Sequence, residues 1–308
     1  MNRRQFVGTG AVWLGMPLLT RTKRQRTSTR LILLGTAGGP RPRTTRSATA
    51  HAIVIGDAVY VVDCGDGVAR QLVLAGVPLP RVRHIFITHH HSHHNADYGN
   101  LILLAWEAGL RTRVDSWGPP PLGRITDLFF QMNAADISAR TADEGRVPLK
   151  PLVRAHELRD GGPVMQDASV RVTAAVVHHP PTVPAFAYRF DAVDRSIVFS
   201  GDTTPSERLV TLARNADILV HEALYDAAAV DRHVASVPNA SDLRRSILSH
   251  HTTAEEAGRI AAEARVEMLV LSHLVPAEDP AITDEMWINA AGRHFDGRIV
   301  VGKDLMEL

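Results

Sequence analysis

Residues 84–98 read HIFITHHHSHHNADY, and the rest of the sequence is best interpreted outward from this stretch. Residues 82–88 are apolar and β-branched, which is typical of a buried strand. Residues 96–110 carry apolar side chains at helical spacing. Five histidines therefore lie where a strand ends and a helix begins: His89, His90, His91, His93 and His94. Because imidazole nitrogens are preferred ligands of zinc and similar metals, this turn predicts a metal site.

Further histidines and acids follow the ends of other predicted strands. A histidine-rich tract can also be an exposed segment with loose metal affinity, and a single buried histidine is more often only hydrogen-bonded. The repetition favours one shared site, because ligands at strand ends meet at one edge of a sheet. These residues are His178 and His179 after residues 170–177, Asp202 after 197–200, His221 and Glu222 after 218–220, and His273 after 269–271.

The composition is that of a soluble globular protein, with 45% hydrophobic and 22% charged residues in a chain of 308. Its single cysteine, Cys64, excludes an intramolecular disulfide and every zinc motif built from several cysteines. Strands dominate the first two thirds, and helices alternate with strands in the last third. This order predicts an α+β fold of two sheets packed face to face with helices outside, formed by one domain over residues 31–308. Residues 122–165 predict a helix followed by an irregular polar stretch.

The first thirty residues differ from the rest. Arg3 and Arg4 form a twin-arginine pattern, and residues 7–19 are a short apolar stretch. That stretch is too short to span a bilayer and is typical of an export signal. We therefore expect residues 1–30 to be a leader for the twin-arginine pathway and the mature protein to be periplasmic or extracellular, with no membrane span. The alternatives are a basic N-terminal extension and a cytoplasmic protein.

The leader also carries the excess of positive charge. Residues 1–30 hold seven Arg or Lys and no acid, so the remaining 27 basic and 33 acidic residues give a net charge of −6. A body of this charge has no general electrostatic attraction for nucleic acid. The sequence therefore favours a small-molecule substrate.

Several motifs together resemble the metallo-β-lactamase superfamily, and most closely its branch of ribonuclease Z and related arylsulfatases. The resemblance is carried by Thr88-His89-x-His91-x-x-His94, His179, Ser200-Gly201-Asp202-Thr203 and His273. Four more stretches support it: LGTAGG at 34–39, DCGDG at 63–67, HEA at 221–223 and HTTA at 251–254. The resemblance runs from about residue 31 to the C-terminus, and it implies an αββα sandwich.

The resemblance also implies a ligand set for two zinc ions per chain. His89, His91 and His179 would bind one ion, His94 and His273 the second, and Asp202 would bridge them. His178 is the alternative to His179, which directly precedes the proline pair at 180–181. In this branch, the residue matched by Glu222 orients the residue matched by His251, which protonates the leaving group.

One position departs from the family pattern. The family has an aspartate immediately before the last histidine of its first motif, and this sequence has His93. That aspartate ligates the second metal and holds the attacking water. An imidazole removes one negative charge and one oxygen ligand, although it can still bind a metal through nitrogen. We therefore expect a weaker second site.

The resulting prediction is a metal-dependent hydrolase that cleaves a small phosphodiester or aryl sulfate ester through a metal-activated hydroxide. Lactone or other carboxylic ester hydrolysis is an open alternative. A second class of function is a catalytically weakened metal-binding or sensor protein, for which His93 is the argument. The sequence is also compatible with a homodimer.

Overall fold

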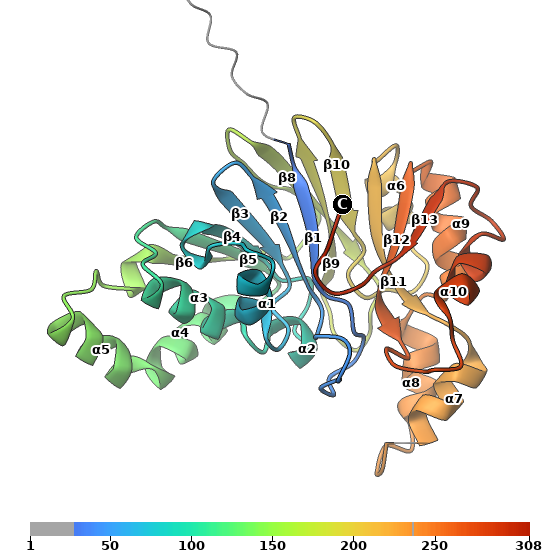
Figure 1. Ribbon diagram of the computed structural model, residues 1–308, viewed down its shortest axis with the longest axis horizontal. Helices are drawn as coiled ribbons and strands as arrows, with labels where there is room; N and C mark the ends of the chain where they lie inside the picture. The colour runs from blue at the N-terminus through green and yellow to red at the C-terminus, as the bar shows by residue number, and fades with distance from the viewer. Residues whose placement is uncertain (1–27, 236) are drawn as a thin grey trace, which may run out of the picture.

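The computed structural model describes residues 28–235 and 237–308, which form two seven-stranded sheets with helices on their outer faces (Figure 1). The first sheet has the order β14-β1-β2-β3-β4-β5-β6, and the second has the order β13-β12-β11-β10-β9-β8-β7. This arrangement confirms the predicted α+β sandwich of two mixed sheets.

The strands of the first sheet are β1 (Arg30–Gly35), β2 (Ala50–Ile55), β3 (Ala58–Val62), β4 (Val82–Phe86), β5 (Val114–Gly118), β6 (Val153–Glu157) and β14 (Met306–Glu307). Those of the second are β7 (Gly162–Gln166), β8 (Val170–Val177), β9 (Ala185–Ala192), β10 (Ser196–Phe199), β11 (Ile218–Leu224), β12 (Met268–Val275) and β13 (Arg298–Val301). The helices are α1 (Val68–Leu74), α2 (Ser92–Asn95), α3 (Tyr98–Glu107), α4 (Leu122–Met132), α5 (Ala134–Asp143), α6 (Glu207–Ala213), α7 (Ala227–Ala235), α8 (Leu243–His250), α9 (Ala254–Ala264) and α10 (Asp284–Ala291).

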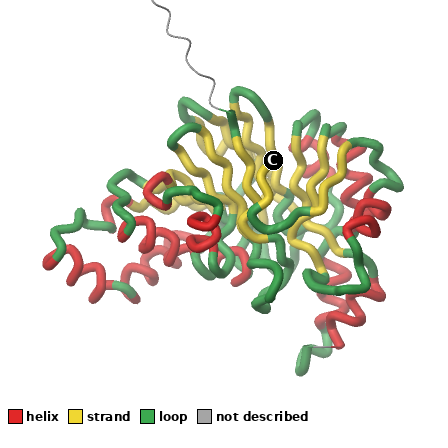
Figure 2. Tube along the Cα trace, viewed as in Figure 1, coloured by secondary structure: helices red, strands yellow, loops and turns green. Residues whose placement is uncertain are grey.

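Alternate side chains of each inner strand serve two different cores. In β1, Leu31 and Leu33 pack between the sheets, whereas Ile32 and Leu34 face the helices of the first half. This follows from the two-residue repeat of a strand, whose neighbouring side chains point to opposite faces. A third core lies between the second sheet and helices α6, α9 and α10. The layers of helix, sheet, sheet and helix are visible in Figure 2.

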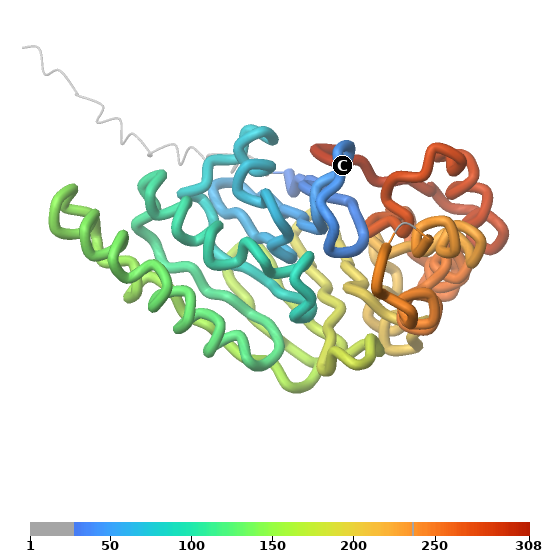
Figure 3. The backbone as a smooth tube through the Cα atoms, turned by 90° about the horizontal axis from the view of Figure 1, so that it is seen from below, coloured from blue at the N-terminus to red at the C-terminus, as the bar shows by residue number. Residues whose placement is uncertain are grey.

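Residues 122–165 are more regular than the sequence suggests. They form α4 and α5, which extend away from the sheets (Figure 3), and then β6 and β7. The expectation of an irregular stretch after one helix was therefore wrong. Strands β6 and β7 lie at the ends of their sheets and are only partly buried. Their side chains are correspondingly polar and do not show the apolar alternation by which strands are recognised.

The predicted leader falls almost entirely outside the described residues. Near its expected end, Thr29 donates from its backbone amide to Asp194 at 2.9 Å, and Arg30 opens β1. No helix in the described part of the chain is long and apolar enough to cross a membrane.

Parallel strands bring the candidate residues to one edge. Strands β3 to β6 run parallel in the first sheet, and β10 to β13 run parallel in the second. The turn after β4, the segment after β10 and the last residues of β11 and β12 therefore face the same end of the sandwich. This edge carries the histidines and acids singled out in the sequence.

Candidate metal centre

The histidine-rich turn between β4 and α2 is held by the carboxylate of Asp63. Thr88 donates to Asp63 from its backbone amide at 2.8 Å and from its hydroxyl at 2.9 Å. His94 donates from Nδ1 to the same carboxylate at 2.8 Å. Asp63 adopts a left-handed backbone conformation with φ of 61° at the end of β3, which is uncommon for a residue with a side chain. Such conformations are characteristic of sites where function fixes the backbone.

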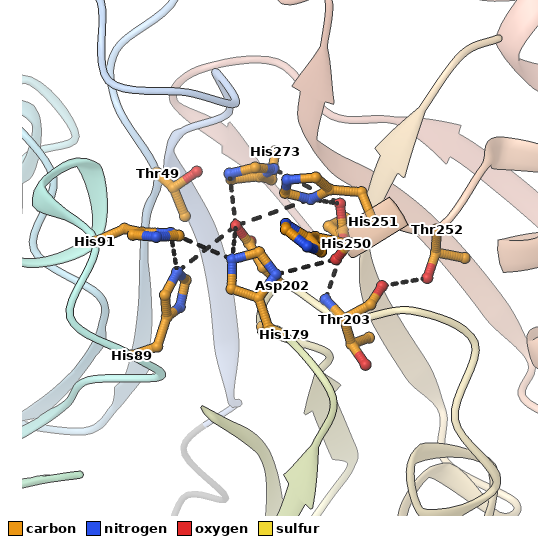
Figure 4. Close-up of polar contacts among 12 residues, drawn as sticks. Thr49, His89, His91, His179, Asp202, Thr203, His250, His251, Thr252 and His273 are labelled. Atoms are coloured by element: carbon orange, nitrogen blue, oxygen red, sulfur yellow. Dashed lines mark hydrogen bonds and ion pairs between the residues drawn. The ribbon is translucent and has the colours of Figure 1, made fainter. Parts of the chain in front are cut away.

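Imidazoles from both halves of the chain surround Asp202, among them His89, His179 and His273, which are labelled in Figure 4. The distances from Asp202 Oδ2 to the nearest imidazole nitrogens are 3.7 Å for His89, 3.9 Å for His93, 3.4 Å for His94, 3.8 Å for His179 and 3.3 Å for His273. These residues come from segments between 88 and 273 in the sequence. The two sheets thus contribute to one centre.

Three groups of possible ligand atoms among the described residues share Asp202, and one of them, Asp202, Glu222, His251 and His273, includes the His251–Glu222 pair. The other two divide the remaining histidines: the first group contains His89, His91, His179 and Asp202, and the second group contains His93, His94, Asp202 and His273. This division has the membership that the resemblance implies, with His93 added to the second group. His178 is exposed and belongs to neither group, which favours His179 of the two alternatives.

Hydrogen bonds to one ring nitrogen leave the other nitrogen free to bind a metal. His89 and His179 bond through Nδ1 to the Thr88 hydroxyl at 3.0 Å and to the His250 carbonyl at 3.0 Å. His91 instead bonds through Nε2 to the Thr182 hydroxyl at 3.0 Å. The remaining nitrogens, Nε2 of His89, Nδ1 of His91 and Nε2 of His179, converge. Partners of this kind fix the tautomer of metal-binding histidines.

The separation of these nitrogens suits a tetrahedral ion. Nδ1 of His91 lies 3.0 Å from Nε2 of His89 and 3.2 Å from Nε2 of His179. Four ligands bonded to zinc at 2.0–2.1 Å in a tetrahedral arrangement are about 3.3 Å apart. The first group therefore has the spacing of a metal site before any rearrangement.

Buried polar atoms without hydrogen-bond partners also indicate a metal site. Both carboxylate oxygens of Asp202 and Nε2 of His94 are buried and have no hydrogen-bond partner among the described residues. A buried carboxylate without hydrogen bonds is unfavourable, because it has lost its water and gained only charge contacts, the shortest of them at 3.3 Å. Divalent ions between Asp202 and the imidazoles would satisfy these atoms. The residues present therefore fit divalent-metal binding.

The charge states agree with this fit. Burial lowers the pKa of His179 to about 4 and that of His273 to about 3, so both are neutral at pH 7, the form that binds metals. Burial also disfavours charge on His94, but the carboxylates of Asp202 and Asp63 outweigh it and raise its pKa to about 10. The protein thus favours positive charge at the second group, where a metal ion would supply it.

His93 points into the centre rather than toward solvent. Its Nε2 lies 3.2 Å from Nε2 of His273, and only 9% of its side chain is exposed. Burial lowers its pKa, followed by the charges of His94 and His273. The position that departs from the family pattern is therefore occupied by a neutral imidazole within reach of the second group.

His251 and Glu222 form a buried pair beside the two groups. Nδ1 of His251 lies 2.8 Å from Oε2 of Glu222, whose other oxygen accepts the backbone amide of Thr203 at 2.8 Å. Burial lowers the pKa of His251, but the Glu222 carboxylate more than offsets this and raises it to about 9. With Nδ1 engaged, His251 can contact a substrate only through Nε2. The pair can thus hold a proton and present it from a fixed direction.

The structure separates two candidate histidines from the centre. His221 is buried in β11, and its Nδ1 bonds to the carbonyl of Glu222 at 2.7 Å. His90 bonds to the carbonyl of Pro119 at 2.8 Å. Neither belongs to a group of ligand atoms.

Two residues that orient ligands were not singled out in the sequence. These are Asp63, behind His94, and Thr182, behind His91. Asp63 lies in the DCGDG stretch that supports the resemblance, and its position at a strand end is the signal that could have identified it. Thr182 has no comparable signal, because it lies in a loop after the proline pair.

A cavity of about 370 Å³ opens onto the centre. His91, His93, His251 and His273 form part of its lining, so both groups and the His251–Glu222 pair border one space. A cavity of this size lies at the lower end of the range for small-molecule sites.

Comparisons with known proteins agree with this arrangement. Residues 59–274 match the family model of the beta-lactamase superfamily domain. The chain is 30% identical over 278 residues to ribonuclease Z of Mycobacterium bovis, covering 89% of this chain and 96% of the relative. It is 32% identical over 276 residues to ribonuclease Z of Mycobacterium avium, covering 89% and 95%.

Solved structures show the same fold at lower sequence identity. The short form of human tRNase Z superposes with a TM-score of 0.65 at 20% identity, covering 91% of this chain and 98% of that one. The metallo-beta-lactamase fold protein YhfI of Bacillus subtilis gives a TM-score of 0.66 at 20% identity, with the same coverage. The chain therefore belongs to the metallo-β-lactamase superfamily of hydrolases, in its ribonuclease Z-like branch.

Proposed function

We propose that the protein is a zinc-dependent phosphodiesterase that binds two ions per chain around Asp202. The observation that carries the proposal is the buried Asp202 carboxylate, which has no hydrogen bond and is surrounded by five imidazole nitrogens at 3.3–3.9 Å. His89, His91 and His179 would hold one ion, and His93, His94 and His273 the other. When bound, such ions acidify water and stabilise negative charge on an ester.

His251 would act as the general acid. Hydrolysis of an ester requires a proton on the departing oxygen, and the imidazolium of His251 supplies it from Nε2. Glu222 keeps the proton on His251 and fixes the ring, because its carboxylate is only 2.8 Å from Nδ1. A protein that only stores metal has no use for such a pair, so the pair supports catalysis over the metal-binding or sensor alternative.

The ribonuclease Z relatives support a phosphodiester over the other esters. Their name describes cleavage of RNA, which is a phosphodiester. Aryl sulfates, lactones and other carboxylic esters are supported only because a metal site of this kind suits esters in general. The net charge of −6 over residues 31–308 and the small cavity favour a small substrate. RNA is the second candidate, and it is favoured by the extent of the match to these relatives. Export through the predicted leader would restrict the protein to extracytoplasmic substrates.

A metal analysis and a substrate screen test the proposal together. Protein loaded with zinc should contain about two ions per chain and should hydrolyse bis(p-nitrophenyl) phosphate faster than p-nitrophenyl sulfate or p-nitrophenyl acetate. A precursor tRNA with a 3′ trailer is the fourth substrate. Its efficient cleavage would replace the small substrate by RNA, and bound metal without turnover of any substrate would leave the metal-binding alternative.

Adjacent histidines provide a matched control. His179→Ala should lose metal and activity, because it removes a nitrogen of the first group. His178→Ala should retain both, because that side chain is exposed and outside both groups. Equal behaviour of the two variants would contradict the assignment of the first group.

A further inference from the structure

The cavity above the centre has one wall that the hydrolytic residues do not explain. Residues of α8 and of the segment before it contribute an apolar surface made of Val237, Leu243 and Ile247. None of the described residues that line this cavity is an aspartate or a glutamate. An apolar wall suits contact with an organic group, and it offers no ligand to a metal ion.

Two arginines border the same cavity. Arg41 and Arg43 lie in the segment between β1 and β2 and line the space together with His91 and His93. They also line an adjoining cavity of about 250 Å³, which includes His93, Arg46 and Arg70. Arg41 and Arg43 therefore line the same space as His93 and His273 of the second group but belong to neither group of ligand atoms.

The side chain of Arg43 is partly buried, and its Nε has no hydrogen-bond partner among the described residues. Burial lowers its pKa, and the charge of Arg41 lowers it further. Glu278 lies near enough to oppose this effect, but its carboxylate accepts hydrogen bonds from the amide and hydroxyl of Thr45, each at 2.6 Å.

Arg46, in the same segment, differs from Arg43 because it has a structural role. Its guanidinium donates to the Thr36 hydroxyl at 2.6 Å and to the Gly302 carbonyl at 2.7 Å. The second of these bonds ties the segment between β1 and β2 to the residue that follows β13. Arg43 makes no such bond from Nε among the described residues, and it lines the cavity instead.

The neighbouring side chain of His233 adds no negative charge to this region. His233 of α7 also lines the cavity. Burial lowers its pKa to about 4, and the charges of Arg43 and Arg41 contribute to that decrease. Two arginines at a cavity whose described lining contains no carboxylate favour the binding of an anion there.

We propose that Arg41 and Arg43 form a subsite for a second anionic group of the substrate, and that the apolar wall of Val237, Leu243 and Ile247 binds the organic body between that group and the ester. The proposal deepens the phosphodiesterase function and rests on it for the bond that is cleaved. It defines the substrate class as a small, doubly anionic ester with an aromatic or aliphatic body. Arginine is suited to this role because its planar fork binds carboxylate and phosphate in two-point contacts.

Two matched esters test the subsite in the zinc-loaded enzyme. One is p-nitrophenyl phenyl phosphate, and the other carries a carboxylate on its phenyl ring. Arg43→Gln should lower kcat/KM for the carboxylated ester by roughly 10-fold, the effect of one charge-assisted hydrogen bond, and should change that for the plain ester much less. Arg43→Lys should recover part of the loss. Arg208→Gln, an exposed charge-matched control that lines a different cavity, should change neither rate.

A binding measurement separates the subsite from turnover. The fluorescent anion 1-anilinonaphthalene-8-sulfonate and the neutral N-phenyl-1-naphthylamine share an aromatic body and differ in charge. Arg43→Gln should weaken binding of the anion and leave the neutral dye unchanged. If no ester is hydrolysed but this difference appears, the subsite stands and the phosphodiesterase proposal fails. The opposite outcome is that both esters are hydrolysed, that Arg43→Gln changes their kcat/KM values equally and that it leaves the binding of both dyes unchanged. This result would refute the subsite and leave the phosphodiesterase proposal intact.

Discussion

His93 changes the chemistry of the second ligand group by replacing a carboxylate with an imidazole. Its Nε2 lies 3.9 Å from Oδ2 of Asp202, so the ring is near enough to share an ion with that carboxylate. A neutral nitrogen ligand stabilises a divalent cation less than a carboxylate does, because it carries no negative charge. The second ion should be held more weakly than in relatives with aspartate.

His93→Asp should therefore strengthen the second site. We expect second-site affinity to rise by roughly 10–100-fold, the range seen when single residues around a metal are exchanged, and phosphodiester turnover to rise with it. Metal titration and steady-state rates on bis(p-nitrophenyl) phosphate measure the two effects. Tighter metal binding with slower turnover would show that His93 has a catalytic part of its own.

Asp63 should determine the affinity of the same site indirectly. Asp63→Asn keeps the size of the side chain but removes the charge that accepts Nδ1–H of His94 at 2.8 Å. Zinc affinity at the second group should fall by roughly 10–100-fold, as measured by competition with a chelator. Asp66→Asn, an exposed change in the same DCGDG stretch, is the control. Unchanged affinity in Asp63→Asn would mean that the ring of His94 is fixed by packing alone.

Changing the general acid should have an effect that depends on the leaving group. His251→Ala should slow esters of poorly acidic alcohols much more than p-nitrophenyl esters, because a good leaving group departs without a proton. Glu222→Gln should give a smaller loss with the same pattern. A series of phenyl esters of increasing leaving-group pKa measures this, and parallel losses across the series would remove His251 as the acid.

At the scale of single elements, β12 positions a metal ligand through a bulge that its sequence does not predict. The register between β11 and β12 shifts at Glu222, so His273 lies in a bulge with φ of 45°. Bulges of this kind redirect a side chain, here toward Asp202. The sequence predicted a strand that ended at residue 271 and a histidine after it, whereas β12 continues to Val275. Periodicity cannot reveal a bulge, because its cause is pairing with a neighbouring strand.

The packing of α9 against α10 depends on Gly258. A methyl group at this position would lie 2.0 Å from the carbonyl oxygen of Ala291, which is far inside contact distance. Gly258→Ala should therefore destabilise the fold by about 1–3 kcal/mol, although alanine is the better helix former by about 1 kcal/mol. Thermal unfolding should show a lower Tm, by roughly 2–4 °C per kcal/mol. Glu263→Ala on the exposed side of α9 should leave Tm unchanged, and the same result for Gly258→Ala would show that α10 can move aside.

At the scale of the whole molecule, the centre joins two halves that otherwise meet through an apolar core. His89, His91, His93 and His94 follow β4 of the first sheet, whereas His179, Asp202 and His273 belong to the second sheet or the segments that follow its strands. Bound ions would therefore link the sheets directly. A ligand that binds only the folded state stabilises it according to its free concentration relative to its dissociation constant.

Metal removal should thus lower the stability of the entire domain. Free zinc at a hundred times its dissociation constant adds about 2.7 kcal/mol to the free energy of unfolding, so a chelator should lower Tm. Scanning calorimetry with zinc and with EDTA measures the difference. The difference should disappear in Asp202→Ala, which removes the residue common to both groups. An unchanged Tm on chelation of the wild-type protein would mean that metal binding and folding are independent.

The sequence was most informative where chemistry and strand ends coincide. The sandwich followed from short motifs, because each motif joins a buried strand to a polar turn, and the same motifs contain the histidines that the structure brings close to Asp202. The separation of His221 from the centre did not follow, since it depends on which face of β11 each side chain occupies. Nor did the arrangement of Arg41 and Arg43 beside His93, which depends on a loop between β1 and β2 that has no periodic pattern.

Because the carboxylate of Asp202 belongs to both groups of ligands, the two ions would not bind independently. The first ion to bind takes up negative charge that the second also requires, so the second binds to a less attractive centre. By reciprocity, loss of the weaker ion would tighten the hold on the stronger one. Titration of the metal-free protein with zinc should then show two separate binding steps. At free zinc concentrations between these steps, the protein would hold one ion and would differ as a catalyst from the protein with two.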